Sequence, residues 1–220
     1  MKKFFKQSSF LQIKKLILLL ILLSIYTFIC AFSYVNAVSS NIEDSVFRLH
    51  VIANSDSTED QNLKYIVRDK VLEYINNISK NVSSKEDVIK MAQDNIDKIQ
   101  TIAENTIKEN GYNYCVKLAI GNYAFPTKTY GDISFPAGFY DALKIEIGEA
   151  KGQNWWCVMF PPLCFVDVSS GIVPEESKEI IKENLLNEEY DLLSENNNDF
   201  KFKFKIVEMF QNISIKLAQR

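Results

Sequence analysis

The stretch Phe47-Arg48-Leu49-His50-Val51-Ile52-Ala53-Asn54-Ser55-Asp56-Ser57 decides how this chain folds. Its first part is rich in β-favouring residues and ends in a polar Asn-Ser-Asp turn, so residues 45–54 are predicted to form a strand. Successive side chains of a strand point to opposite faces, which places Arg48, His50 and Ile52 on one face and Leu49, Val51 and Ala53 on the other. Ser57 is suited to cap a following helix, so residues 54–57 are interpreted as a capping turn rather than a metal-binding loop.

Further elements follow from the spacing of apolar residues along the chain. One helix is predicted to run to about Ile78, and a second, long helix from Ser84 to Asn110. Strands are predicted at residues 112–123, 142–148 and 155–160, with turn-rich segments at 125–131 and 135–138. A helix begins at Pro174, and residues 200–217 alternate like a strand but are assigned as a C-terminal helix. This order predicts an α+β fold, a mainly antiparallel sheet with helices packed on one face.

The N-terminus has the layout of an export signal. Residues 1–37 contain no Asp or Glu, and five lysines precede an almost unbroken apolar stretch from Leu16 to Phe32. Val35-Asn36-Ala37 then offers small residues where a signal peptidase reads, so cleavage is predicted after Ala37. The apolar stretch nearly suffices to span a bilayer, so an uncleaved anchor is the alternative. In both cases residues 38–220 leave the cytoplasm as a single domain, because the lysines stay inside.

Export changes the charge of the remaining chain. Without the five N-terminal lysines, 20 of the 25 basic residues remain against 28 acidic ones, which is a net charge of −8. An acidic domain of this kind is a poor candidate for binding nucleic acid through its phosphates. It also gains no attraction toward anionic lipid.

The sequence offers few candidate catalytic groups. His50 is the only histidine, which excludes any site that needs two, and the sequence lacks GxSxG, GxGxxG and P-loop motifs. No metal site is predicted, because His50 and the dispersed cysteines have no recognisable ligand spacing. A carboxylate pair cannot be identified among so many acidic residues, so an exported cell-wall hydrolase stays as the alternative function.

The aromatic run Trp155–Asp167 holds Cys157 and Cys164 on either side of Phe160-Pro161-Pro162. A tight corner at the two prolines would bring these cysteines nearly opposite each other, and the exported compartment permits a disulfide. Two buried thiols are the alternative, and Cys115 is expected to stay reduced in the core. The run itself suits a buried strand or an anchor patch for a protein partner.

Several separate motifs resemble one known family. They begin with Arg48-Leu-His-Val-Ile-Ala-Asn-Ser-Asp-Ser57 and continue through residues 59–61, 67–69, 125–131, 136–138, 148–149, 152–154 and 155–167. In this order, behind an export signal, they resemble the stage II sporulation protein R family of endospore-forming Firmicutes. The resemblance covers about residues 45–170, whereas the helical C-terminal part, residues 174–220, carries little of it.

The resemblance implies a signalling role. Similar proteins are secreted from the forespore into the intermembrane space, where they activate a membrane-embedded aspartic peptidase that processes pro-sigma E in the mother cell. This chain would be the activator and no enzyme, its partner the extracytoplasmic face of that peptidase, without a cofactor or small-molecule substrate. The candidate partner-binding residues, chosen by residue type and position, are Arg48, His50, Asn54, Asp56, Lys128 and Tyr130. Arg48→Ala is expected to abolish processing without loss of stability.

Overall fold

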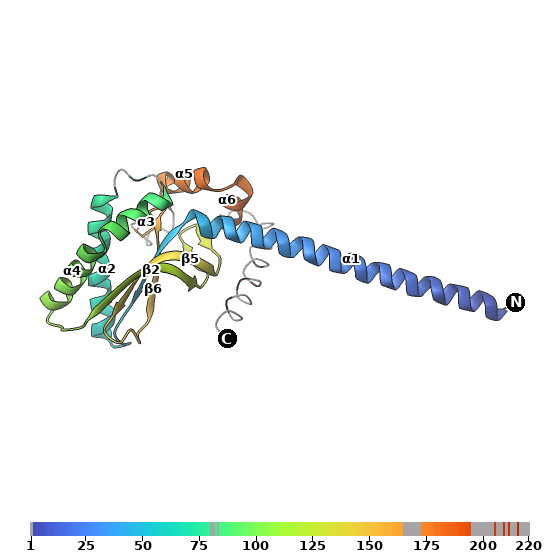
Figure 1. The fold of residues 1–220 in the computed structure, drawn as a ribbon, viewed down its shortest axis with the longest axis horizontal. Coiled ribbons are helices and arrows are strands. Elements are labelled where there is room, and N and C mark those ends of the chain that lie inside the picture. The colour runs from blue at the N-terminus through green and yellow to red at the C-terminus, as the bar shows by residue number, and fades with distance from the viewer. Residues whose placement is uncertain are drawn as a thin grey trace. The chain divides into compact units, whose positions relative to one another are not determined.

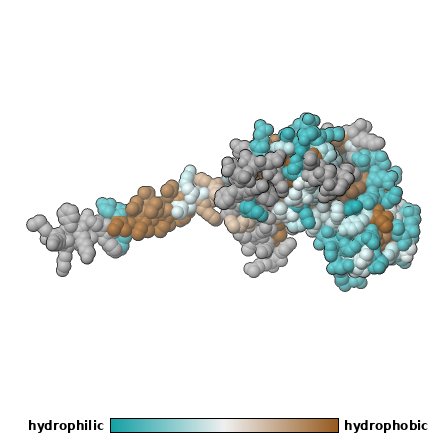
Figure 2. All heavy atoms as spheres, turned by 180° about the vertical axis from the view of Figure 1, so that it is seen from behind, coloured by the Kyte–Doolittle hydropathy of each residue, from teal (hydrophilic) through white to brown (hydrophobic). Residues whose placement is uncertain are grey.

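A computed structural model describes residues 2–79, 82, 84–164 and 173–194, together with positions 205, 209, 211 and 215. It divides into two compact units, Met1–Val38 and Ser39–Arg220. The first unit is the greater part of helix α1 (Lys2–Ser45), in which Gln12–Ser45 is long and apolar enough to cross a membrane. Figure 2 shows its apolar side chains as a continuous band. By length and composition this helix is compatible with a signal peptide or an anchor.

The second unit is built on a four-stranded sheet in the order β2-β5-β1-β6 (Figure 1). Its strands are β1 (Phe47–Ile52), β2 (Val116–Phe125), β5 (Gly138–Ile147) and β6 (Asn154–Phe160). Strand β1 lies inside the sheet, parallel to β5 and antiparallel to β6, and β2 pairs antiparallel with β5. Two of these three pairings are antiparallel, which confirms the mainly antiparallel sheet.

Three helices, α2 (Thr58–Ile78), α3 (Lys85–Asp94) and α4 (Ile96–Glu109), pack on one face of this sheet. Leu49 and Val51 of β1 lie on that face, as their alternation predicts, in a core shared with all three helices. The serine caps are confirmed, because Ser57 accepts a hydrogen bond from the Asp60 amide and Ser84 accepts one from the Asp87 amide. The α+β fold with helices on one face is therefore confirmed.

The predicted helix from Ser84 to Asn110 is wrong in one respect, because it is two helices separated at Asn95. The Asn95 side chain donates to the carbonyl of Met91 at 2.9 Å, while its own carbonyl accepts from the amides of Lys98 and Ile99. Asparagine competes in this way for backbone groups that would otherwise continue a helix.

Two turn-rich segments contain a small hairpin that the sequence does not reveal. Strands β3 (Lys128–Tyr130) and β4 (Ile133–Phe135) pair antiparallel around Gly131, whose φ of 58° suits glycine. The helix predicted to begin at Pro174 and run through Leu186 is observed as α5 (Glu175–Asn184), and a further short helix, α6 (Asn187–Leu193), follows it. Most of the predicted C-terminal helix lies outside the described residues, and the four positions described there are helical.

A cluster of hydrogen bonds fixes the loops at the carboxyl end of β1. Asn54 donates to the buried carboxylate of Asp60 at 2.7 Å and accepts from the Glu149 amide at 3.0 Å. Gly148 lies beside it with φ 59°, and a β-carbon at this position would overlap Asn54 Oδ1. Only glycine therefore fits here without displacing the Asn54 side chain.

Gly148→Ala is expected to lower the free energy of unfolding by about 3 kcal/mol, since it combines an unfavourable φ with the displacement of Asn54. Gly111→Ala is the matched control, because Gly111 has φ 85° but a β-carbon there would have no neighbouring atom within 4 Å. That control should cost about 1–2 kcal/mol. Equal losses in urea denaturation of the two variants would contradict a role for Asn54.

Candidate functional site

Arg48 is fully buried in a box of aromatic rings. Its guanidinium carbon lies 4.2 Å from the ring centre of Phe125 and 4.7 Å from that of Tyr140. Its Nη2 donates to the hydroxyl of Tyr130 at 3.0 Å, and Nε and Nη1 have no hydrogen-bond partner among the described residues. The ring faces supply the negative potential that this desolvated cation needs.

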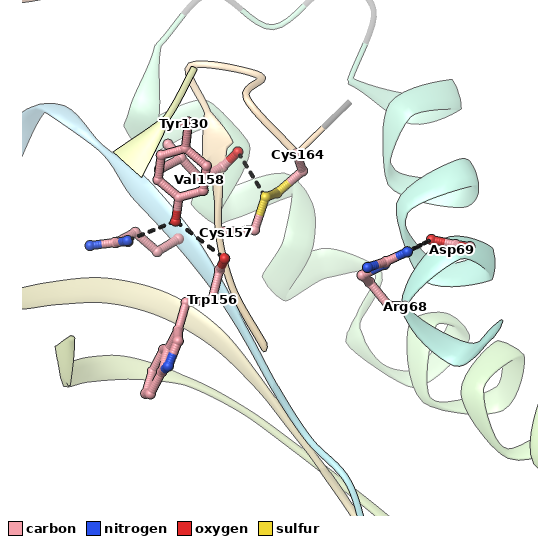
Figure 3. The surroundings of a disulfide bond; sticks show 8 residues. Arg68, Asp69, Tyr130, Trp156, Cys157, Val158 and Cys164 are labelled. Atoms are coloured by element: carbon pink, nitrogen blue, oxygen red, sulfur yellow. Dashed lines mark hydrogen bonds and ion pairs between the residues drawn. A yellow bond between two sulfur atoms is a disulfide. The ribbon is translucent and has the colours of Figure 1, made fainter. Parts of the chain in front are cut away.

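The β3–β4 hairpin closes this box. Tyr130 links Arg48 to β6, because its hydroxyl also donates to the Trp156 carbonyl at 3.2 Å (Figure 3). Burial raises the pKa of Tyr130, while Arg48 acts to lower it. The turn of the hairpin is held by Asp132, whose carboxylate pairs with Lys178 at 2.7 Å and accepts from the Val173 amide. The hairpin thus ties the central sheet to the C-terminal helices.

His50 lies on the same face of the sheet, stacked on Trp156 with ring centres 3.7 Å apart. Its Nε2 bonds Asn154 Oδ1 at 2.7 Å, an amide oxygen that can only accept, so Nε2 carries the proton. Nδ1 is buried without a partner among the described residues. Burial lowers the pKa of His50 to about 4, opposed by its hydrogen bond to Asn154.

The structure does not bring the six predicted partner-binding residues together. Their assignment to the surface is wrong for Arg48, His50 and Tyr130, which are buried because aromatic rings and the hairpin cover them. Asn54 and Lys128 are half-buried and Asp56 is exposed. Asn54 and Asp56 follow the carboxyl end of β1, whereas Arg48, near its other end, contacts the hairpin that begins at Lys128.

A surface that the sequence reasoning missed lies where α2 meets β6. Tyr65, Arg68 and Trp155 form what we call the α2–β6 patch. The Arg68 guanidinium lies 4.2 Å from the ring centre of Trp155 and 4.9 Å from that of Tyr65. Burial and the nearby Arg68 lower the pKa of Lys64, and Asp56 is close enough to oppose this shift. The sequence already marked two residues of this patch, because Arg68 belongs to the 67–69 motif and Trp155 to the aromatic run.

Cys157 and Cys164 are joined by a disulfide, with Cα atoms 5.4 Å apart. The chain turns at Pro161-Pro162, and the amides of Leu163 and Cys164 donate to the Val158 carbonyl, which returns Cys164 to β6. Strand residues Cys157 to Phe160 are buried, as the interpretation of a buried strand requires. The expectation for Cys115 is wrong, because it precedes β2 and is exposed. It alternates with buried Val116 and therefore points away from the core.

No group of three or more His, Cys, Asp or Glu side chains that could hold a metal ion occurs among the described residues. The one histidine is buried and bonded to Asn154, so it is not presented to a substrate. The buried side chains around β1 hold the sheet and the hairpin together.

Arg48→Ala is now expected to lower the free energy of unfolding by about 3 kcal/mol, because it leaves a cavity and removes the donor to the Tyr130 hydroxyl oxygen. Arg48→Met keeps the volume without the charge and should cost less than about 1.5 kcal/mol. Thermal unfolding of both variants checks this. Equal losses of stability in the two variants would show that the polar interactions of the guanidinium, and not its packing, stabilise the aromatic cluster around Arg48.

His50 should make the domain acid-sensitive. The unfolded chain binds a proton near the ordinary histidine pKa of 6.5, whereas the folded chain binds it only near 4. Stability is therefore full above the unfolded value and falls as the pH drops from 6.5 to 4. His50→Gln should remove this loss, measured as the difference in Tm between the variant and the parent at each pH. A difference that is constant with pH would contradict the assignment.

Comparison with known proteins places these features in one family. The family model described as Stage II sporulation protein R (spore_II_R) matches residues 43–170. The chain is also 41% identical over 143 residues to "Stage II sporulation protein R" of Bacillus subtilis (strain 168). That alignment covers 64% of this chain and 64% of the relative, so about two thirds of each is compared. No solved structure matches the chain. The matched region contains β1, the hairpin, the α2–β6 patch and the disulfide strand, and the chain belongs to the stage II sporulation protein R family.

Proposed function

We propose that this chain is a secreted signalling protein of endospore formation that activates the membrane-embedded aspartic peptidase processing pro-sigma E in the mother cell. Membership of the stage II sporulation protein R family is the observation that carries the proposal. The apolar N-terminal helix supports it, since an activator made in the forespore must cross that cell's membrane. Once outside, the domain binds the extracytoplasmic face of the peptidase.

The contact surface we propose is the α2–β6 patch, with exposed Asp56 beside it. Trp, Tyr and Arg are the residues that most often dominate the binding energy of protein interfaces. Tyr65 is 36% exposed, and the neighbouring Ile66 on the same helix is 40% exposed. The Arg68 side chain is held over two rings, so it loses little rotamer freedom on binding. By contrast, Arg48 and His50 are buried and serve to build the sheet that supports this patch.

Activation requires that the bound domain favours the active state of the peptidase, because a ligand shifts an equilibrium only by its differential affinity for the two states. The activator then needs no catalytic group of its own. Its binding energy is the only contribution that the proposal requires.

The experiment is co-expression of the full chain with the peptidase and pro-sigma E in a non-sporulating host, with processing followed by immunoblot. Arg68→Ala is expected to reduce processing about tenfold or more, a loss typical of an interface hot spot. Lys70→Ala is the matched control, because Lys70 is exposed on the same helix and pairs only with Glu73 among the residues that the structure describes. Lys70→Ala should leave Tm nearly unchanged, since exposed ion pairs contribute little. Arg68→Ala also removes the contacts with Tyr65 and Trp155, so its Tm is measured and processing is compared at a temperature where both variants are folded.

A further variant distinguishes the α2–β6 patch from the hairpin as the contact surface. If Lys128→Ala abolishes processing while Arg68→Ala does not, the contact surface is at the hairpin and the α2–β6 patch is wrong. Processing that proceeds without the chain, or with it but without the peptidase, overturns the proposed function itself.

A further inference from the structure

The two edges of the sheet differ in how their backbone groups are satisfied. At the β6 edge the Trp156 carbonyl accepts from Tyr130, and the Val158 carbonyl accepts from the amides of Leu163 and Cys164. At the other edge β2 pairs with β5 alone among the described residues. One edge is thus closed by the chain itself, while the other is a ten-residue strand that ends the sheet (Figure 1).

The register shows which groups of β2 are open. The Gly148 amide donates to the Cys115 carbonyl at 2.8 Å, so this opposed pair carries hydrogen bonds between β2 and β5. Hydrogen-bonded and free pairs alternate in an antiparallel ladder, and the register between these strands has no shift. The odd-numbered residues of β2 therefore bond β5. The N–H and C=O groups that point outward belong to Val116, Leu118, Ile120, Asn122 and Ala124.

We propose that this edge pairs with the same edge of a second copy of the chain, antiparallel and centred on Ile120. The five outward residues are symmetric about Ile120, so a two-fold axis there is the only one that uses all of them. Leu118 then faces Asn122 of the copy, and Val116 faces Ala124. The eight strands form one continuous sheet, with the same surface used on both sides, as two-fold dimers require.

The charges on β2 itself suit a second copy as the occupant, although the domain as a whole is acidic and two copies repel each other at long range. The domain is acidic overall, with a net charge of −8 for the 20 basic and 28 acidic residues that remain without the five N-terminal lysines. Strand β2, however, contains no acidic residue and a single basic one, Lys117. In the centred antiparallel register Lys117 lies opposite Tyr123 of the copy, where a cation and a ring attract. Parallel pairing in register would instead stack Lys117 on its own counterpart.

The side chains of this edge also suit the pairing. Leu118 and Ile120 project toward the helix side and are partly exposed members of the core cluster. A copy centred on Ile120 would cover both with its own Leu118 and Ile120. A long exposed edge strand with apolar side chains otherwise invites indiscriminate association, and a specific partner removes this liability. The inference does not depend on the proposed function.

Cysteine cross-linking of the full chain in membranes tests the register. Cys30 and Cys115, the free cysteines among the described residues, are first replaced by serine. Ile120→Cys should then form a disulfide-linked dimer on mild oxidation, because opposed hydrogen-bonded residues have Cα atoms about 5.5 Å apart. Lys117→Cys is the matched control, since the two lysines would be about 20 Å apart in the centred register. Cross-linking at 117 that equals or exceeds that at 120 overturns the proposal.

A proline variant tests whether the open edge holds the dimer. Ile120→Pro removes an outward N–H and no bond to β5, so the domain should fold with nearly the same Tm while the dimer Kd rises about tenfold or more. Sedimentation of the full chain in detergent gives the mass. Ala119→Pro removes a bond to β5 and should lower Tm strongly. A dimer that persists in Ile120→Pro, or a wild-type chain that stays monomeric, overturns the inference.

Discussion

The burial of one cation, Arg48, is the constraint on which much of this domain depends. An ion removed from water must be compensated by its surroundings, and here the compensation comes from distant parts of the chain. Rings from β2, β4 and β5 surround the guanidinium, and Tyr130 of β3 accepts a hydrogen bond from it. The hairpin must therefore lie over β1 before the central strand is stable. Because Asp132 of the same hairpin is bonded to Lys178, the C-terminal helices are coupled to this condition as well.

The local elements could be predicted from the sequence because their causes are local. Ser57 and Ser84 lie next to the amides that they cap, and Leu49 and Val51 alternate with their neighbours on one strand. The site could not be predicted in the same way. Arg48 and Tyr130 are separated by 82 residues, and nothing near Arg48 in the sequence indicates that a cation will be enclosed. The strands of the hairpin have three residues each, too few for an alternating pattern to be recognised.

The motifs that carry the family resemblance divide into two groups once the contacts are known. One group makes contacts between strands, loops and helices inside the domain and therefore specifies the fold. It consists of Arg48, Asn54, Asp60 and Gly148. Asp56 is exposed, and Arg68 is partly exposed and packs over Tyr65 and Trp155 at the border of α2 and β6. Most of the motif residues that carry the family resemblance therefore stabilise the sheet and its loops. The contact surface proposed above is small and lies on one helix and one strand.

The disulfide between Cys157 and Cys164 makes the covalent structure of the chain depend on the redox state of its compartment. The two cysteines are seven positions apart and are brought together by the turn at Pro161-Pro162. Thiols of this kind stay reduced in the cytoplasm and become oxidised outside it. A chain in a reducing compartment and one in an oxidising compartment therefore differ by a covalent bond. This bond lies on the strand that carries Trp155, so the proposed contact surface is supported by a link that only an oxidising compartment allows to form.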